Sequence, residues 1–275
     1  MALVDVHVHF MPQNVLDKVW AFFDRVRESG VDWSIHYRTD ENARLTALRE
    51  LGVVAFAPLV YPHKPGMAGW LNDWAADFAA RVPEAVPTGT FYAEPGAGAY
   101  VRKALEAGAR CFKSHVQVGG YDPRDALLDG VWGQLAEAGV PVVVHCGDGP
   151  MPGEFTGLGV FEGVLRRHPA LTAVIAHAGM PDYAGALDIA ERYPNVHVDT
   201  TMVGTPFTEQ LAPLPSDWRA RIAGMADRVV LGSDFPNIPY LYEVQLQAIR
   251  SWGLDAAAEQ AVLHDNGARL LQLSR

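Results

Sequence analysis

The feature that most constrains this chain is a repeated unit made of a helical stretch, a stop signal and a short run rich in β-branched residues. Glycine, which readily adopts the left-handed backbone that ends a helix, supplies the stop in three copies: Leu48–Val53, Leu105–Ala109 and Leu135–Val140. Proline, which lacks the amide hydrogen needed to continue a helix, supplies it in three more: Pro83, Pro169 and Pro194. Six junctions of one kind indicate a chain in which helices and strands alternate.

The runs between these stops predict eight strands: Leu3–Val8, Val53–Ala57, Val86–Tyr92, Arg110–His115, Pro141–His145, Thr172–Ala176, Asn195–Asp199 and Val229–Gly232. The intervening helices carry apolar residues at helical spacing, which predicts one buried face for each; the first carries Val15, Val19, Phe22, Phe23 and Val26. Eight such units in about 250 residues have the size of a closed barrel. We therefore expect an α/β fold, a single (β/α)8 TIM barrel forming one domain over residues 1–275, with an open doubly wound sheet as the alternative.

Charge and hydropathy exclude several classes of partner. The formal net charge is −10, and no basic cluster interrupts it, so a nucleic acid would be repelled. No apolar stretch approaches the roughly 20 residues of a membrane-spanning helix, and the apolar start, Ala2–Val8, has no basic leader or cleavage site of a signal peptide. We expect a soluble cytoplasmic protein that acts on a small molecule, with no nucleic-acid or membrane partner; a homodimer is compatible with its size.

The first predicted strand carries two histidines on one face. Its sequence alternates, so Asp5, His7 and His9 share one face and the intervening valines share the other. In a barrel the valines would face the helices, and the two imidazoles would project inward, where both can reach one cation. A lone buried histidine is more simply explained by hydrogen bonding, but a pair at one strand end favours a metal ion.

Three later strands end in further residues of the metal-ligating type. His145, His177 and Asp234 each close an apolar run. Barrel enzymes place their active sites at the carboxyl ends of the strands, so these residues are expected to converge with His7 and His9. Three histidines and a carboxylate could surround one ion and leave a position for water, and imidazole ligands suit zinc.

At this point the motifs resemble those of the amidohydrolase superfamily. The similarity rests on Asp-Val-His-Val-His at Asp5–His9, Val-His-Cys-Gly at Val144–Gly147, Ala-His-Ala-Gly at Ala176–Gly179 and Gly-Ser-Asp-Phe-Pro at Gly232–Pro236. It extends from Val4 to the closing segment His264–Leu271. The chain most resembles the amidohydrolase-related branch, which also contains decarboxylases of aromatic and muconate-type acids.

The resemblance implies roles for particular residues. His7, His9, His145 and Asp234 would bind a divalent metal, with zinc expected, and His177 would act beside it as a catalytic group facing the substrate. Lys113 matches the position at which some two-metal members carry a carboxylated lysine; His145 and His177 would then ligate the second ion. One metal is favoured over two, because carboxylation of Lys113 needs a site shape that a sequence does not encode locally. An ammonium at Lys113 that binds a substrate carboxylate or pairs with an acid explains the residue equally well.

Other residues are candidates for binding the substrate. They are Lys113 and His115 on one face of the fourth predicted strand, Tyr61 and His63 in the loop after the second, and Arg124 after the fourth. His197 and Asp199 share a face of the seventh predicted strand, where we expect them to support the metal ligands or to pair with each other. Both cysteines, Cys111 and Cys146, are expected to be buried thiols.

These expectations combine into a metal-dependent hydrolase. The ion would lower the pKa of a bound water from about 15.7 towards 7, Asp234 would accept the proton of that water, and the substrate would be a lactone, amide or related ester. The alternative is a metal-dependent decarboxylase of an aromatic or dienoic acid, because one fold supports several reactions. A further alternative is an inactive barrel that serves as a binding protein.

Overall fold

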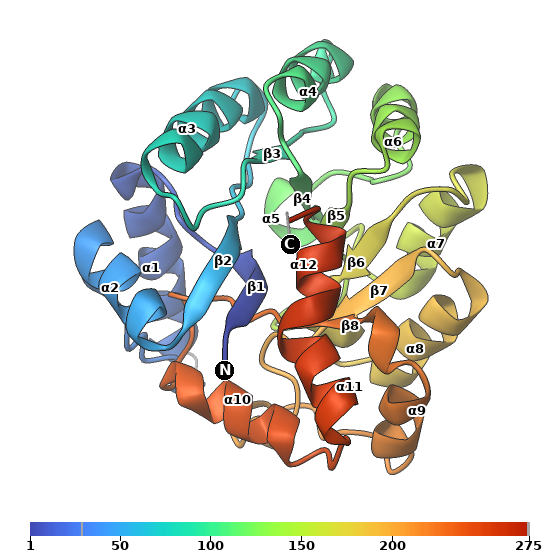
Figure 1. The fold of residues 1–275 in the computed structure, drawn as a ribbon. Helices are drawn as coiled ribbons and strands as arrows, with labels where there is room; N and C mark the ends of the chain where they lie inside the picture. The colour runs from blue at the N-terminus through green and yellow to red at the C-terminus, as the bar shows by residue number, and fades with distance from the viewer. Residues whose placement is uncertain (29, 274–275) are drawn as a thin grey trace.

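The computed structural model describes residues 1–28 and 30–273, and in them strands and helices alternate along the chain (Figure 1). The strands are β1 (Leu3–Val8), β2 (Val53–Pro58), β3 (Thr88–Thr90), β4 (Cys111–His115), β5 (Val142–His145), β6 (Ala173–Ile175), β7 (Val196–Asp199) and β8 (Val229–Val230). The helices are α1 (Gln13–Glu28), α2 (Glu41–Glu50), α3 (Ala68–Arg81), α4 (Ala97–Glu106), α5 (Val116–Gly119), α6 (Ala126–Ala138), α7 (Leu158–Arg167), α8 (Tyr183–Arg192), α9 (Trp218–Gly224), α10 (Tyr242–Arg250), α11 (Ala256–Gln260) and α12 (Asn266–Leu270).

All strand pairs are parallel, and helices surround the strands in a ring (Figure 1). The strands pair in two groups, β1-β2 and β3 through β8 in sequence order. Backbone hydrogen bonds join the groups at both seams: Val6 N donates to Leu231 O at 2.9 Å, and Val86 N donates to Phe56 O at 2.8 Å. The expected α/β TIM barrel is confirmed, and an open sheet is not observed among the described residues.

The predicted helix stops have the expected geometry. Gly139, for example, follows α6 with φ of 62°, and its amide hydrogen-bonds to Leu135 and Ala136 carbonyls, which are among the last of the helix. The strands differ more from prediction. β3 covers only Thr88–Thr90 and β8 only Val229–Val230, because the flanking residues bond to loops and to neighbouring segments outside a regular ladder.

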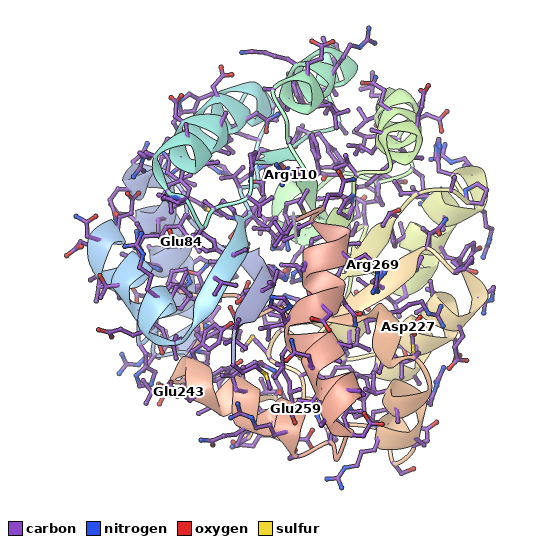
Figure 2. All side chains as sticks on the ribbon, in the orientation of Figure 1. Glu84, Arg110, Asp227, Glu243, Glu259 and Arg269 are labelled. Atoms are coloured by element: carbon purple, nitrogen blue, oxygen red, sulfur yellow. The ribbon has the colours of Figure 1, made fainter. Side chains whose placement is uncertain are left out.

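Side chains fill the interior and the space between strands and helices (Figure 2). An inner cluster, which includes Val4, Val6, Cys111, Val143 and Val174, lies inside the strands. Apolar side chains of the strands' other faces pack against the helices. As TIM barrels generally do, the protein encloses a packed core rather than a pore.

Helix α12 crosses the end of the barrel at which the strands begin (Figure 1). Asn266 Nδ2 donates to Val229 O at 2.8 Å, and Leu271 joins the inner cluster. Arg269 and Arg110, both labelled in Figure 2, hydrogen-bond to Asp227 O and Gln272 O on this side. Helix α12 and these contacts thus cover this end of the strands.

Within the described residues, no helix combines the length and the apolarity required to cross a membrane.

Candidate metal centre and active site

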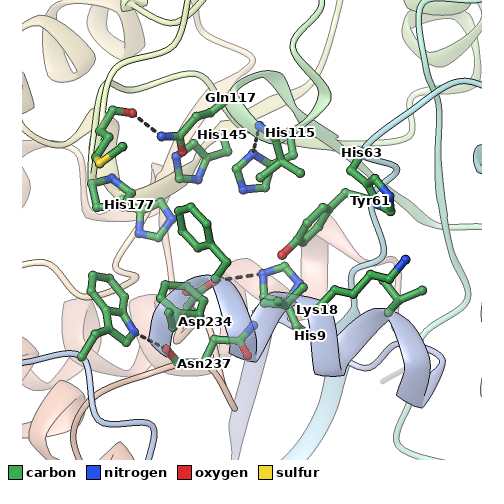
Figure 3. Close-up of a pocket in the computed structure, with 18 residues that line it drawn as sticks. His9, Lys18, Tyr61, His63, His115, Gln117, His145, His177, Asp234 and Asn237 are labelled. Atoms are coloured by element: carbon green, nitrogen blue, oxygen red, sulfur yellow. Dashed lines mark hydrogen bonds and ion pairs between the residues drawn. The ribbon is translucent and has the colours of Figure 1, made fainter. Parts of the chain in front are cut away.

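A pocket of about 380 Å³ opens at the carboxyl ends of the strands (Figure 3). His9 follows β1, His115 and His145 end β4 and β5, His177 follows β6, and Asp234 follows β8; all five line the pocket. Residues separated by up to 225 positions in the sequence are therefore side by side. This is the convergence that the alternating pattern predicted.

The predicted facing of β1 is only partly correct. His7 and His9 do point to the centre, but Val4 and Val6 lie in the inner cluster rather than against the helices. Asp5 points away and contacts Tyr242 of α10. The pairing of β1 with β2 shifts register between Asp5 and Val8, and such a bulge reverses the phase of alternation. The strict two-residue period therefore failed within β1.

His7 is held by a carboxylate behind it. Its Nδ1 donates to Asp199 Oδ2 at 2.8 Å, and both side chains are fully buried. Asp199 also accepts the backbone amide of His177 at 2.8 Å. Burial and then the nearby Lys113 ammonium hold the pKa of His7 well below 6.5, so the imidazole is neutral. Its single proton lies on Nδ1, and Nε2 presents a lone pair to the centre.

His9 and Asp234 form the second part of the centre. His9 Nδ1 donates to Leu59 O at 2.9 Å, and its Nε2 lies 2.9 Å from Asp234 Oδ1 (Figure 3). His7 Nε2 is 3.4 Å from the same oxygen. Burial raises the pKa of Asp234, but the interactions with His9, His7 and His177 outweigh burial and keep this pKa far below its ordinary value. Asp234 has an unusual backbone, with φ of 65°.

These donors fit a divalent cation. With both Nδ1 atoms donating to protein acceptors, two Nε2 lone pairs face one carboxylate oxygen, an arrangement that a cation between them stabilises. His7, His177 and Asp234 each offer a ligand atom, and these atoms lie within 4.8 Å of one another. Imidazole nitrogens with a carboxylate oxygen are ligands that zinc and other divalent transition metals accept.

His177 lies closer to this centre than its predicted role beside the metal required. Its side chain is 9% exposed, and its Nδ1 is buried with no hydrogen-bond partner among the described residues. Burial is the main cause of a pKa lowered to about 4, so the ring is neutral at pH 7. A buried unpaired ring nitrogen is costly unless a ligand or an ion satisfies it.

His145, a predicted ligand, lines the same pocket but has a second partner. Its Nε2 donates to Gly149 O at 2.9 Å, which leaves Nδ1 as the nitrogen with a lone pair. Its ring stacks on His115 with centroids 4.1 Å apart and lies 4.8 Å from the ring of His177. Among the described residues, the cluster of closest ligand atoms contains His177 and not His145.

Lys113 reaches the centre from the interior of the barrel. It is completely buried, and its Nζ lies 2.8 Å from His7 Nε2. Burial, only partly offset by Asp234 and Asp199, lowers the pKa of Lys113 to about 8. Its ammonium and a metal ion would therefore compete for the same lone pair of His7.

The other predicted residues separate into two groups. Tyr61 and His63 line the pocket with His115 (Figure 3), and the Tyr61 ring lies 4.6 Å from the His115 ring. Arg124 does not line the pocket; it is half-exposed and pairs with Asp122 at 2.8 Å. Arg124 thus forms a surface ion pair instead of a pocket contact.

Asp199 and His197, predicted to share a role, have different surroundings. Asp199 supports His7 as expected, whereas His197 lies one layer deeper, where burial and the charges of Arg269 and Arg228 lower its pKa. The two residues do not pair. Cys111 and Cys146 are both buried and free, as predicted.

A buried network that the sequence did not reveal supports the centre from behind. Asp5 Oδ2 accepts hydrogen bonds from Ser233 Oγ at 2.5 Å and from Tyr242 OH at 2.8 Å. Asp5 Oδ1 accepts a hydrogen bond from His7 N at 3.0 Å. Burial, opposed by these hydrogen bonds, raises the pKa of Asp5 to about 7. The one signal in the sequence was Asp5 beside His7, but Tyr242 lies 237 residues away and no local pattern links them.

The fold and this cluster define a class: a TIM barrel with a histidine and carboxylate centre at the carboxyl end of its strands. A family model described as amidohydrolase matches residues 4–273, and the chain therefore belongs to the amidohydrolase family. Among curated proteins, no match is found.

Solved structures with the same fold cover nearly the whole chain. An uncharacterised TIM-barrel protein from Bordetella bronchiseptica is 19% identical, covers 99% of both chains and has a TM-score of 0.75. The 2,6-dihydroxybenzoate decarboxylase from Rhizobium is 16% identical over 99% of both chains, with a TM-score of 0.67. A 5-carboxyvanillate decarboxylase from Novosphingobium aromaticivorans, solved with bound manganese, is 16% identical over 99% of this chain and 97% of its own, with a TM-score of 0.65.

Proposed function

We propose that this protein is a metal-dependent decarboxylase of an aromatic carboxylic acid. The observation that carries the proposal is the neutral ring of His177, whose Nδ1 has no hydrogen-bond partner among the described residues, beside His7 and Asp234 at the inner end of the pocket. Loss of carbon dioxide needs polar groups that hold the acid, and His177 and Asp234 line the same pocket as apolar side chains that can pack on an aromatic ring. The decarboxylases among the solved neighbours support the same choice.

The ligands we propose are His7, His9, His177 and Asp234, with His145 beside them, in a one-domain barrel. When bound, a divalent ion would neutralise charge on the substrate oxygens and hold the acid in place. Imidazole ligands favour zinc, whereas a solved neighbour binds manganese, so both ions belong in any reconstitution.

The chain's own residues can move the proton that the reaction requires. Asp234 is ionised at neutral pH, so it would accept the hydroxyl proton of a hydroxylated aromatic acid and return it to the ring carbon that bears the carboxylate. The bond between that ring carbon and the carboxylate carbon then breaks, its electron pair returns to the ring, and carbon dioxide leaves. The phenolate so formed takes one proton from solvent.

His177 and Tyr61 would orient the acid during this transfer. The ring of His177 is neutral at pH 7, because its pKa is about 4, and the ring nitrogen that does not bind the metal can donate a hydrogen bond to a substrate oxygen without adding charge. Burial raises the pKa of Tyr61, so its phenol stays protonated and remains a hydrogen-bond donor. Both residues line the pocket beside Asp234.

Hydrolysis, which the sequence placed first, is the second candidate, and the family description favours it. The same centre would activate a water, and Asp234 would accept the proton of that water. The solved neighbours named as decarboxylases give the lyase the stronger support.

The test is to supply the metal-reconstituted protein with hydroxybenzoates in deuterated water. A decarboxylase releases carbon dioxide and yields a product with one deuterium at the carbon that held the carboxylate. Small lactones, amides and esters are assayed in parallel. Opening of one of these substrates with no carbon dioxide from any acid would replace the proposal with the hydrolase.

A further inference from the structure

Exposed apolar side chains gather at the mouth of the pocket. Phe22 is 36% exposed, Val118 is 38% exposed and Met151 is 53% exposed, and all three line the pocket. They come from α1, α5 and the loop after β5, which are far apart in the sequence. Apolar surface that gathers around a cavity in this way marks a binding surface.

Helix α1 supplies much of this surface. Val15, Val19 and Phe22 repeat at helical spacing and line the pocket together. Val15 is 5% exposed, Val19 is half-buried and Phe22 is the most exposed. The inner half of this apolar face packs on the protein, whereas its outer half borders the pocket, so the sequence-based prediction of a fully buried face does not hold there.

Aromatic side chains held by other contacts continue this wall of the pocket. Phe23 stacks on Trp33 with ring centroids 4.8 Å apart, and Trp33 Nε1 donates to Asn237 O at 2.7 Å. These side chains also line the pocket. A preformed wall loses little conformational freedom when a ligand packs on it.

The outer half of the pocket offers few polar groups to a ligand. Gln117 Nε2 donates to Met151 O (Figure 3), and Asn237 Oδ1 accepts a hydrogen bond from Trp20 Nε1 at 3.2 Å, so the protein engages one polar atom of each side chain. Lys18 and His63 also line the pocket, and both are exposed. Most of the polar groups that a ligand could reach therefore lie at the inner end, with Lys18 and His63 added at the rim.

We propose that the substrate is an aromatic acid with an apolar extension, a second ring or a branched alkyl chain, that packs between α1 and the Met151 loop. Its carboxylate would lie beside Asp234 and His177, and Lys18 would favour its overall negative charge. The cavity of about 380 Å³ lies in the range of pockets that take drug-sized ligands. This inference rests on the proposed function, because the polar end fixes the orientation of the acid.

A matched pair of ligands tests the extension. Salicylate and 4-phenylsalicylate are titrated into the metal-reconstituted protein, and binding is measured by calorimetry. Burial of the second ring is expected to tighten binding about tenfold or more. Equal affinities, or no binding of either acid, would overturn the proposal.

Variants at the mouth locate the second ring. Phe22→Ala and Met151→Ala are each expected to weaken 4-phenylsalicylate about three- to tenfold and to leave salicylate within about twofold. The matched control is Leu241→Ala, because Leu241 is also 53% exposed but does not line the pocket. Equal weakening of both acids by the mouth variants would contradict the placement.

Two further measurements distinguish this inference from the proposed decarboxylase function and from a dimer contact at the mouth. If the protein binds the extended acid selectively but releases no carbon dioxide, decarboxylation is refuted and the binding inference stands. If it releases carbon dioxide from salicylate but binds both acids equally, decarboxylation stands and the binding inference is refuted. Sedimentation of the wild type and of Phe22→Ala shows whether a second copy of the chain covers the mouth. A dimer that dissociates in Phe22→Ala would replace the ligand as the occupant and overturn the proposal.

Discussion

The two ends of the pocket are built on different principles. At the inner end, ligand-type side chains are fixed by second partners: Asp199 holds His7, the Leu59 carbonyl holds His9 and the Gly149 carbonyl holds His145. At the mouth, Phe22 and Met151 are exposed and apolar. From this comparison we expect chemistry to depend on the inner end, where small displacements are costly, and selection of the substrate to depend on the mouth.

Removal of the metal should give the largest effect. Dialysis against a strong chelator is expected to abolish turnover and to lower the melting temperature, because an ion that binds only the folded state stabilises it. Activity is expected to return with added manganese or zinc, as measured by carbon dioxide release and by metal content per chain. Full activity in a protein free of metal would contradict the proposal that catalysis depends on a metal ion at the inner end of the pocket.

Asp234→Asn should follow in size. The variant keeps the shape of the side chain but cannot carry a proton as a carboxylate does, so kcat is expected to fall about 10³-fold. A thermal melt within a few degrees of the wild type would show that the fold is retained. Turnover at the wild-type rate would exclude Asp234 as the proton carrier.

Asp199→Asn tests whether the supporting partners matter. The amide loses the negative charge that holds His7 Nδ1–H, and metal affinity is expected to fall about 10- to 100-fold. Competition with a chromophoric chelator measures this affinity without any substrate. Asp255→Asn, at the start of α11 and remote from the pocket, is the control, and equal losses in both variants would deny Asp199 a specific role.

Tyr242→Phe should have the smallest effect at the inner end. It removes one of three hydrogen bonds to Asp5, and a loss of stability of about 1 kcal/mol is expected from denaturant unfolding. Metal release from this variant is expected to be a few times faster, because Asp5 also holds the amide of His7. Tyr121→Phe, which removes a buried hydrogen bond to Ser114, should match the stability change and leave metal release unaltered.

The same contrast explains what the sequence could and could not predict. Alternation of stops and strands predicted the barrel, and strand ends predicted that His7, His9, His145, His177 and Asp234 would meet, because both depend on local spacing. The prediction that Val4 and Val6 face the helices was wrong, because a bulge depends on the pairing with β2 rather than on β1 alone. Tyr242 was missed and Arg124 was misplaced, since long-range contacts and turn directions leave no periodic signal.

The backbone conformation at the inner end limits which residue types can replace Asp234 and His177. Asp234 and His177 have φ of 65° and 55°, a region that asparagine, aspartate, histidine and glycine enter far more readily than branched residues. A replacement at either position must therefore satisfy the main chain before its chemistry counts. New activities in this barrel should arise more easily through Phe22, Val118 and Met151, whose backbones impose no such restriction.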